Sequence, residues 1–511
     1  MADTQQQTFR AIEAATGQAI APDYSVSTVS DVAAACHAAA AAFDAYRETD
    51  AEARAAFLEA IGDEIMAIGD ALLDRAGLES GLPAARLTGE RGRTVNQLKL
   101  FAQVVRDGHW RQLRIDPAQP DRAPLPRPDL RLRMVPLGPV AVFGASNFPL
   151  AFSTAGGDTA AALAAGCPVV VKGHPAHPGT DAMVADAIRA AAKRTGMPHG
   201  VFGHVRGPDI ALGAALVQDP RIAAVGFTGS RAGGLALVRL AQMREVPIPV
   251  YAEMSSVNPV VLMPAALAAR GASLGEAFVG SLTMGSGQFC TNPGLVLAIA
   301  GEGLDAFEAA AAQALTGHSP QPMLSGGIRA AYAAGTKALS NNAAVRELAA
   351  GQPGDGVASE PSRLFAVDAT AVDADPTLTE EVFGASSLVV RCRDLADLIT
   401  ALEKLEGQLT ATLHLDAEDH DDVRQLLPIL ERKAGRVLVN GWPTGVEVAH
   451  AMVHGGPFPA TSDGRSTSVG SLAIDRFLRP VCYQDLPDAL LPPELRDGAT
   501  GPLLLDGKSR L

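Results

Sequence analysis

The sequence predicts an α/β protein built around a mostly parallel, doubly wound sheet. Short apolar runs alternate with helical patterns through residues 140–227, and this alternation is typical of strand–helix–strand units. A second alternation of the same kind runs from about Tyr251 to Pro443. The chain has 511 residues, of which 47% are hydrophobic and 19% charged, so it can form two or three domains with large cores.

Composition excludes several classes of function. The net charge of −14 disfavours nucleic-acid binding, which needs a basic face. The N-terminal residues 1–5 lack the features of a signal peptide, and no window reaches about 18 uninterrupted apolar residues, so we expect no membrane span. The cysteines are few, far apart and outside any C-x-x-C pair, which predicts no disulfide framework, no metal site and a reducing cytoplasm. They are Cys36, Cys167, Cys290, Cys392 and Cys482.

The first hundred residues show helical periodicity. Apolar side chains recur at helical spacing between acidic ones. They are Phe57, Leu58, Ile61, Ile65, Ile68 and Leu72. The segment Gly81–Pro83 ends this helix, and Leu87–Val105 resumes another.

Two strand-like segments predict a separate arm. A proline-rich stretch leads into Leu130–Val135, where apolar and basic residues alternate with a period of two, as in an exposed strand. Phe477–Tyr483 is a similar segment near the end of the chain. We expect the two to pair and, because exposed strand edges seek partners, to join copies of the chain into a homodimer or homotetramer.

The first α/β region is predicted from residue 140 onward. Its expected strands are Val140–Phe143, Pro168–Val171, Val201–Val205 and Ile222–Phe227. Its expected helices are Thr159–Ala165, Thr180–Arg194 and about Asp209–Val217, with Thr180 as an N-cap. Right-handed crossovers would place a ligand beyond the carboxyl ends of these strands.

The second α/β region has strands and helices of similar length. The expected strands are Pro259–Met263, Leu295–Ile299, Ser387–Val390, Thr410–Leu415 and Arg436–Val439. The expected helices include Leu274–Met284, Leu304–Leu315 and Ala417–Leu430, and 351–361 is expected to be a surface loop.

Polar residues follow the predicted strands where each one ends. Asn147 follows the first strand, Lys172 the second, and Thr228 the fourth, while Glu253 closes the first α/β region. Cys290 lies in the glycine-rich segment 285–294, where backbone N–H groups can approach whatever the sulfur attacks. Taken alone, a cysteine in such a stretch is more often inert packing than a catalytic residue.

Together these motifs resemble the aldehyde dehydrogenase superfamily over nearly the whole chain. The motifs, in family order, are Asn147–Leu150, Lys172, Phe227–Ser230, Glu253, Gly287–Cys290 and Glu380–Gly384. Segments 172–180 and 454–463 resemble a narrower branch containing 2-oxoglutarate semialdehyde (2,5-dioxopentanoate, or 2,5-dioxovalerate) dehydrogenases and an NADP-dependent long-chain fatty aldehyde dehydrogenase. The resemblance implies a modified Rossmann cofactor domain (1–112 and 136–252), a catalytic domain (253–474) and an oligomerisation arm (113–135 and 475–511).

The residue types suit aldehyde oxidation. A Cys290 thiolate would form a thiohemiacetal, and the Asn147 amide and the Cys290 backbone N–H would stabilise its oxyanion. Glu253 would then activate water to hydrolyse the thioester. The plainer alternatives are a turn residue for Asn147 and a surface or capping carboxylate for Glu253.

The resemblance also implies a set of cofactor contacts. They would come from Ser146, Lys172, His174, Pro175, Arg206, Phe227, Thr228, Gly229, Ser230, Gly233, Glu381 and Phe383. Lys172 would bond ribose hydroxyls, the helix after Ser230 would hold the pyrophosphate, and Glu381 and Phe383 would contact the nicotinamide end. Alternatively, Lys172 is a snorkelling edge lysine, and Glu381 with Phe383 is an ordinary helix-end pair.

Two departures from the family pattern bear on the cofactor. Pro175 stands where many NAD-preferring relatives carry a glutamate that binds the adenosine ribose, so no carboxylate would repel a 2′-phosphate. Lys172, with Arg206, would attract that phosphate, and we expect NADP to be accepted besides NAD. Ser255 and Ser256 replace the two glycines usual after the glutamate, which puts the local backbone in question.

The substrate is the least determined feature. The helix 89–101 resembles one that lines the substrate tunnel, and it carries Arg91, Arg93 and Gln97. An arginine there would hold a distal carboxylate through two hydrogen bonds, with Arg91 and Gln97 as the expected substrate contacts; for any one of the three, a solvated helix face is the more common alternative. Phe148 and Phe289 would form aromatic walls. The resemblance to the narrower family branch favours 2-oxoglutarate semialdehyde as the substrate. In contrast, residues 446–449, which are expected on the opposite wall of the substrate tunnel, suit an alkyl chain. The rivals are a broad-range fatty or aliphatic aldehyde dehydrogenase, a coenzyme A-acylating enzyme and a catalytically silent structural relative.

Overall fold

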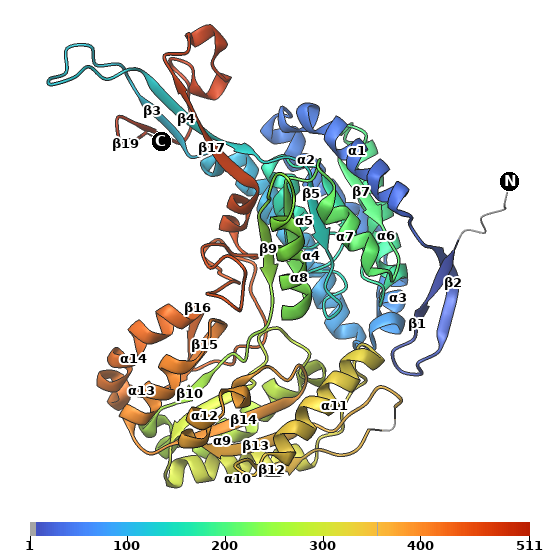
Figure 1. The fold of residues 1–511 in the computed structure, drawn as a ribbon, viewed down its shortest axis with the longest axis vertical. Coiled ribbons are helices and arrows are strands. Elements are labelled where there is room, and N and C mark those ends of the chain that lie inside the picture. Colours follow the sequence, from blue (N-terminus) through green and yellow to red (C-terminus); the bar gives the residue numbers. More distant parts are fainter. Residues whose placement is uncertain (1–6, 355, 511) are drawn as a thin grey trace.

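A computed structural model describes residues 7–354 and 356–510, which form three sheets and a separate hairpin (Figure 1). The residues on which the signal-peptide expectation rests lie outside these ranges. Within them, no helix is both long and apolar enough to cross a membrane. The mixed α/β architecture with parallel sheets confirms the predicted fold class.

The first sheet is parallel and has five strands in the order β7-β6-β5-β8-β9. The strands are β5 (Val140–Phe143), β6 (Val169–Lys172), β7 (Phe202–Val205), β8 (Ala224–Thr228) and β9 (Val250–Glu253). The helices between them are α5 (Gly157–Ala165), α6 (Pro178–Arg194), α7 (Ile210–Gln218) and α8 (Arg231–Gln242). The chain order reverses between β5 and β8, and a doubly wound sheet binds its ligand at such a switch point.

The start of α6 differs from the prediction. The helix begins at Pro178, two residues before Thr180, because proline suits the first helical position and needs no N–H partner there. Thr180 is therefore inside the first turn. Its N–H and hydroxyl both donate to the buried Glu79 carboxylate, at 2.9 and 2.8 Å.

The second sheet has seven strands in the order β12-β13-β14-β11-β10-β15-β16, parallel except at the β12 edge. The strands are β10 (Val260–Leu262), β11 (Leu295–Ile299), β12 (Arg346–Ala350), β13 (Arg363–Asp368), β14 (Ser386–Cys392), β15 (Gln408–His414) and β16 (Ala434–Val439). The helices are α9 (Pro264–Thr283), α10 (Glu302–Thr316), α11 (Gly326–Asn341), α12 (Ala369–Ala374), α13 (Leu395–Lys404) and α14 (His420–Lys433). The strands β12 and β13 were not predicted.

The third sheet projects away from the rest of the molecule (Figure 1). Its order is β17-β4-β3-β18-β19, from β3 (Leu113–Asp116), β4 (Leu130–Pro136), β17 (Leu478–Gln484), β18 (Leu503–Leu505) and β19 (Lys508–Arg510). The predicted pairing is confirmed, since β4 and β17 are antiparallel with Leu132 opposite Cys482.

The N-terminal region contains a hairpin that the sequence reading missed. β1 (Thr8–Ile12) pairs with β2 (Ala19–Ser25) before the helices α1 (Val29–Arg47), α2 (Ala51–Ala67), α3 (Asp70–Ser80) and α4 (Ala84–Asp107). Most hairpin residues are exposed, so no buried face imposes an alternating pattern. The predicted helix through Leu72 is broken at Gly69, whose φ of 71° is left-handed.

Candidate active site

Strand register brings the predicted polar residues to one edge of the first sheet. Phe143 is paired with Lys172 on one side and with Phe227 on the other, and Thr228 is paired with Glu253. The parallel strands therefore end together, and the residues that follow them meet at their carboxyl ends. This is the arrangement that the alternating pattern predicted.

The Cys290 loop follows α9 through a turn of unusual backbone geometry. Gly285, Ser286 and Gly287 have φ values of 56°, 54° and 69°, all in the left-handed region. A Cβ at Gly287 would lie 2.3 Å from the carbonyl carbon of Gly384, so only glycine fits there. Ser286 tolerates its conformation while its hydroxyl donates to the Gln321 carbonyl at 2.7 Å.

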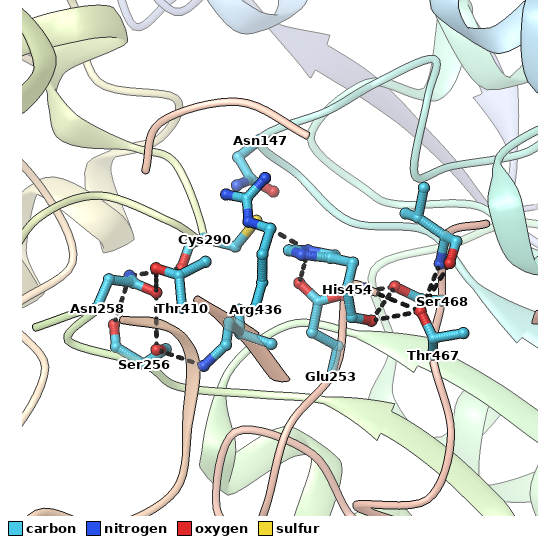
Figure 2. Close-up of polar contacts among 12 residues, drawn as sticks. Asn147, Glu253, Ser256, Asn258, Cys290, Thr410, Arg436, His454, Thr467 and Ser468 are labelled. Atoms are coloured by element: carbon cyan, nitrogen blue, oxygen red, sulfur yellow. Dashed lines mark hydrogen bonds and ion pairs between the residues drawn. The ribbon is translucent and has the colours of Figure 1, made fainter. Parts of the chain in front are cut away.

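A buried amide fixes this loop from below. The Asn258 side chain, which lies beside Cys290 (Figure 2), donates to the Cys290 carbonyl at 2.9 Å. It also donates to the Asn292 carbonyl at 2.9 Å. Its own oxygen accepts from the hydroxyls of Ser256 and Thr410. Ser256, one of the two residues that depart from the family's glycines, is thus part of the support for the nucleophile loop.

Cys290, His454 and Glu253 form a continuous polar chain. The Cys290 Sγ lies 3.3 Å from His454 Nε2, which lies 2.9 Å from Glu253 Oε1 (Figure 2). The Ser468 hydroxyl donates to the other carboxylate oxygen at 3.0 Å. His454 and Glu253 are buried, whereas Cys290 is half-buried and faces a cavity.

Burial sets the protonation of this chain. Burial raises the pKa of the Cys290 thiol well above its usual value, and the nearby Glu253 charge raises it further. Burial alone would also raise the pKa of Glu253, but His454 and the Ser468 hydroxyl outweigh it and hold that pKa below its usual value. The resting pair is therefore a neutral thiol beside an ionised carboxylate.

The partners of His454 identify its tautomer. Nδ1 is buried and has no hydrogen-bond partner among the described residues, so a proton there would be a donor without an acceptor. We therefore infer that the ring carries a proton on Nε2 and donates it to Glu253. The sequence reading assigned no role to His454, although it lies in the branch-like segment 454–463.

The same three side chains are close enough to hold a metal ion. One ligand atom from each of Glu253, Cys290 and His454 lies within 4.8 Å of the others. The sequence predicted no metal site. Because the sulfur also borders the substrate-sized cavity, we interpret the group as a reaction centre rather than a metal centre.

Asn147 lies next to the Cys290 loop. Its Nδ2 donates to the Gln288 carbonyl at 3.1 Å, which leaves its second N–H for another acceptor. Arg86 donates to the Asn147 carbonyl at 2.7 Å and fixes the turn from the other side. This position is consistent with the oxyanion role expected of Asn147.

A cavity of about 470 Å³ opens in front of the sulfur. Its lining comes from α4, the turn after β5, the Cys290 loop and the loop before His454. The lining residues are Pro83, Arg86, Gly89, Glu90, Arg93, Phe148, Phe152, Met284, Gly285, Phe289, Cys290, Thr291, Gln321, Gly445 and Val446. The rings of Phe148, Phe152 and Phe289 pack edge to face and form an apolar wall.

Arg91 and Gln97 do not line this cavity, which corrects the expectation for the helix. The Arg91 guanidinium donates to the Gly69 carbonyl at 2.8 Å. Gln97 is 2% exposed and packs against Gly157 at the start of α5. The cationic lining residues are instead Arg86 and Arg93, which lie seven positions apart, two turns along one face of α4.

The expected cofactor residues around β6 and β7 have mixed surroundings. The Lys172 ammonium donates to the Gly207 carbonyl at 2.7 Å, and His174 stacks on His177 with Pro175 following it. Burial lowers the pKa of His174 to about 3, so its ring is neutral. Arg206 is turned towards the N-terminal hairpin, where it donates to the Ser25 carbonyl at 3.3 Å.

The other expected cofactor residues lie at two further places. The Ser230 hydroxyl caps α8 by accepting from the Gly233 N–H at 3.2 Å, and Gly229 beside it is exposed. Glu381 and Phe383 line a small cavity beside the Cys290 loop. Burial raises the pKa of Glu381 to about 8, and the charge of Glu253 contributes.

With this fold and site in place, comparison with known proteins identifies the family. The sequence profile of the aldehyde dehydrogenase family matches residues 1–472. The chain belongs to this family. It is an oxidoreductase that acts on an aldehyde group, and aldehyde dehydrogenases use NAD or NADP.

Two relatives cover nearly the whole chain. The alpha-ketoglutaric semialdehyde dehydrogenase 2 of Azospirillum brasilense is 61% identical over 98% of this chain and 96% of its own. The alpha-ketoglutaric semialdehyde dehydrogenase of Acinetobacter baylyi is 51% identical over 93% of this chain and 90% of its own. Two solved structures share the fold. A 1-pyrroline-5-carboxylate dehydrogenase has 20% sequence identity and a TM-score of 0.78, and the match covers 94% of this chain and 90% of that one. The betaine aldehyde dehydrogenase of Staphylococcus aureus has 19% identity and a TM-score of 0.79, with 94% and 93% covered.

Proposed function

We propose that the chain oxidises 2-oxoglutarate semialdehyde to 2-oxoglutarate. The observation that carries this proposal is a nucleophile, Cys290, at the mouth of a cavity with an aromatic wall and two arginines. Such a cavity suits a short carbon chain with an anionic end. The relatives at 61% and 51% identity bear the name of the same activity.

The chain's own residues account for activation and oxyanion stabilisation. Glu253, kept ionised by His454 and Ser468, receives the Cys290 proton as the sulfur bonds to the aldehyde carbon. The free N–H of Asn147 and the Cys290 backbone N–H stabilise the oxygen that becomes negative. The bound nicotinamide cofactor supplies the hydride acceptor. Glu253 passes its first proton to solvent and then takes a proton from water, whose oxygen attacks the thioester and releases the Cys290 thiolate; the sulfur regains its proton from Glu253.

The residues at the first sheet's edge fit a dinucleotide. The N-terminus of α8 offers backbone N–H groups to a pyrophosphate. Lys172 ends β6 three positions before Pro175, and its ammonium donates to the Gly207 carbonyl at 2.7 Å. We infer that NADP is preferred, since no carboxylate at 175 repels a 2′-phosphate. Arg206 contributes to this preference only if it leaves the hairpin. Comparing kcat/KM with the two cofactors tests the preference, and a large NAD preference would contradict it.

The arm and the localisation are further parts of the proposal. The projecting sheet ends in open strand edges, so we infer a homodimer or homotetramer formed through 113–135 and 475–511. Deleting 500–511 should lower the oligomeric state in light scattering.

Three of the five cysteines are buried and none is paired, which is consistent with the cytoplasm.

The activity is tested by product analysis with purified protein. We expect 2-oxoglutarate and reduced cofactor in equal amounts from 2-oxoglutarate semialdehyde, without coenzyme A. A requirement for coenzyme A, or inactivity with every aldehyde at stoichiometric enzyme, would refute the proposal.

The second candidate, a broad aliphatic aldehyde dehydrogenase, is favoured by the three phenylalanines of the cavity. Higher kcat/KM for decanal than for the semialdehyde would establish it.

A further inference from the structure

Arg93 is the cavity residue whose hydrogen bonding is least complete. Its Nε donates to the Val446 carbonyl at 3.1 Å, and its guanidinium lies 4.7 Å from the centre of the Phe152 ring. Both terminal nitrogens, Nη1 and Nη2, are buried and have no hydrogen-bond partner among the described residues. A buried guanidinium without acceptors is costly, and an anionic ligand in the cavity would supply the missing acceptors.

Arg86, the other arginine of the cavity, is held by the protein instead. Its Nη2 donates to the Asn147 carbonyl at 2.7 Å and lies 3.9 Å from Glu90. Its guanidinium is sandwiched between Phe148 and Phe289, at 4.7 and 4.3 Å from the ring centres. Arg86 therefore positions the turn that carries Asn147 and has little freedom to bind a substrate.

The charges around Arg93 leave the cavity positive. The nearest acid on α4, Glu90, uses one oxygen to accept the Leu150 and Ala151 N–H groups, and burial raises its pKa. Glu253 is committed to His454 and Ser468. Glu447, the remaining acid that acts on Arg93, is exposed. An anionic ligand group would thus meet an uncompensated guanidinium.

We propose that Arg93 binds the carboxylate of the substrate through Nη1 and Nη2, and that this contact selects aldehydes carrying a distal carboxylate. The inference rests on the proposed function, because it assigns the acid end of the same substrate. Two parallel N–H···O bonds match the planar carboxylate. Phe152 beneath the guanidinium and the Val446 carbonyl at Nε hold the fork in place while the aldehyde end reaches Cys290.

The test compares two substrates that differ only at the distal end, 5-oxopentanoate and pentanal. Arg93→Gln should lower kcat/KM for 5-oxopentanoate about 100-fold, mainly through KM, since two charge-assisted bonds are lost. For pentanal the change should stay within about threefold. Arg93→Lys should recover part of the loss. Arg91→Gln, on the same helix but bonded to Gly69, is the matched control and should change neither substrate.

The outcomes separate this inference from the proposed function. If wild-type enzyme prefers 5-oxopentanoate and Arg93→Gln keeps that preference, the assignment of Arg93 is wrong and the function stands. If both substrates lose activity equally, Arg93 is a structural residue and the inference is overturned. If wild-type enzyme prefers pentanal, both the function and the inference fail. Thermal unfolding of each variant confirms that the fold is retained.

Discussion

The two sides of Cys290 differ in how their polar groups are satisfied. On the buried side, both oxygens of Glu253 accept hydrogen bonds, one from His454 and one from Ser468. On the cavity side, the terminal nitrogens of Arg93 have no partner among the described residues. The Glu253 carboxylate thus has its hydrogen-bond partners without a ligand, whereas the terminal nitrogens of Arg93 do not.

This difference separates chemistry from recognition. Groups that must act on every substrate are preorganised by the chain's own donors and acceptors, which requires no reorganisation during reaction. A group that selects the substrate gains most when its partner comes from the ligand, because a wrong ligand leaves it unpaired. Substitutions on the buried side should therefore affect all aldehydes alike, and those on the cavity side should depend on the substrate.

Removing the nucleophile should have the largest effect. Cys290→Ala should lower steady-state formation of reduced cofactor about 10⁴-fold or more with any aldehyde, because no covalent intermediate can form. Cys482→Ala, at an exposed cysteine in β17, is the control and should retain full activity. Substantial turnover of Cys290→Ala would mean that another residue is the nucleophile.

Glu253→Gln should separate hydride transfer from hydrolysis. The amide cannot take a proton from water, so steady-state turnover should fall about 10²- to 10⁴-fold while a first burst of reduced cofactor remains. Stopped-flow absorbance at 340 nm, a wavelength of the reduced nicotinamide, resolves the burst. Full steady-state activity would remove Glu253 from the mechanism.

His454→Phe should lower kcat about 10- to 100-fold and shift its pH dependence. Without the donor on Nε2 the pKa of Glu253 rises, and since the carboxylate is the active form, the acidic limb of the kcat profile should move to higher pH. His454→Gln, which keeps an N–H, should shift it less. If neither variant shifts the acidic limb of the kcat pH profile, His454 does not stabilise the Glu253 carboxylate.

Ser468→Ala should also move the acidic limb of the kcat pH profile to higher pH, by less than His454→Phe. It removes a single neutral donor from Glu253, worth about 1 kcal/mol, so kcat should fall about fivefold. The effect should be equal for 5-oxopentanoate and pentanal. A loss confined to one substrate would contradict the division between the two sides of Cys290.

Glu447→Gln should have the smallest effect, and only on the cavity side. Removing an exposed negative charge that acts on Arg93 should lower KM for 5-oxopentanoate by about twofold and leave pentanal unchanged. The improvement should disappear at high salt, where exposed charges are screened. A gain with pentanal would show that the substitution reshapes the cavity.

The parts of the fold that sequence predicted are those with a strong local signal. The buried strands β5, β6 and β8 are short apolar runs, and parallel pairing then brings Lys172, Thr228 and Glu253 to one edge. The pairing of β4 with β17 followed from alternation in both segments. The hairpin of β1 and β2 gave no such signal, since it is largely exposed and contains Pro22.

The missed site residues depend on contacts distant in the chain. His454 lies 164 positions from Cys290 in a segment without regular structure, so no periodicity points to it. For α4 a signal was present, since Arg86, Glu90 and Arg93 share one helical face and Arg91 lies on the opposite one. Choosing between the two faces required knowing which one the Cys290 loop covers.

The most direct test of the substrate assignment is a ratio of kcat/KM values for 2-oxoglutarate semialdehyde and pentanal, measured with NADP at low salt. The account predicts a ratio of about 100 or more in favour of the semialdehyde, because only that substrate supplies acceptors for the Arg93 fork. A ratio near one, or one that favours pentanal, would contradict it.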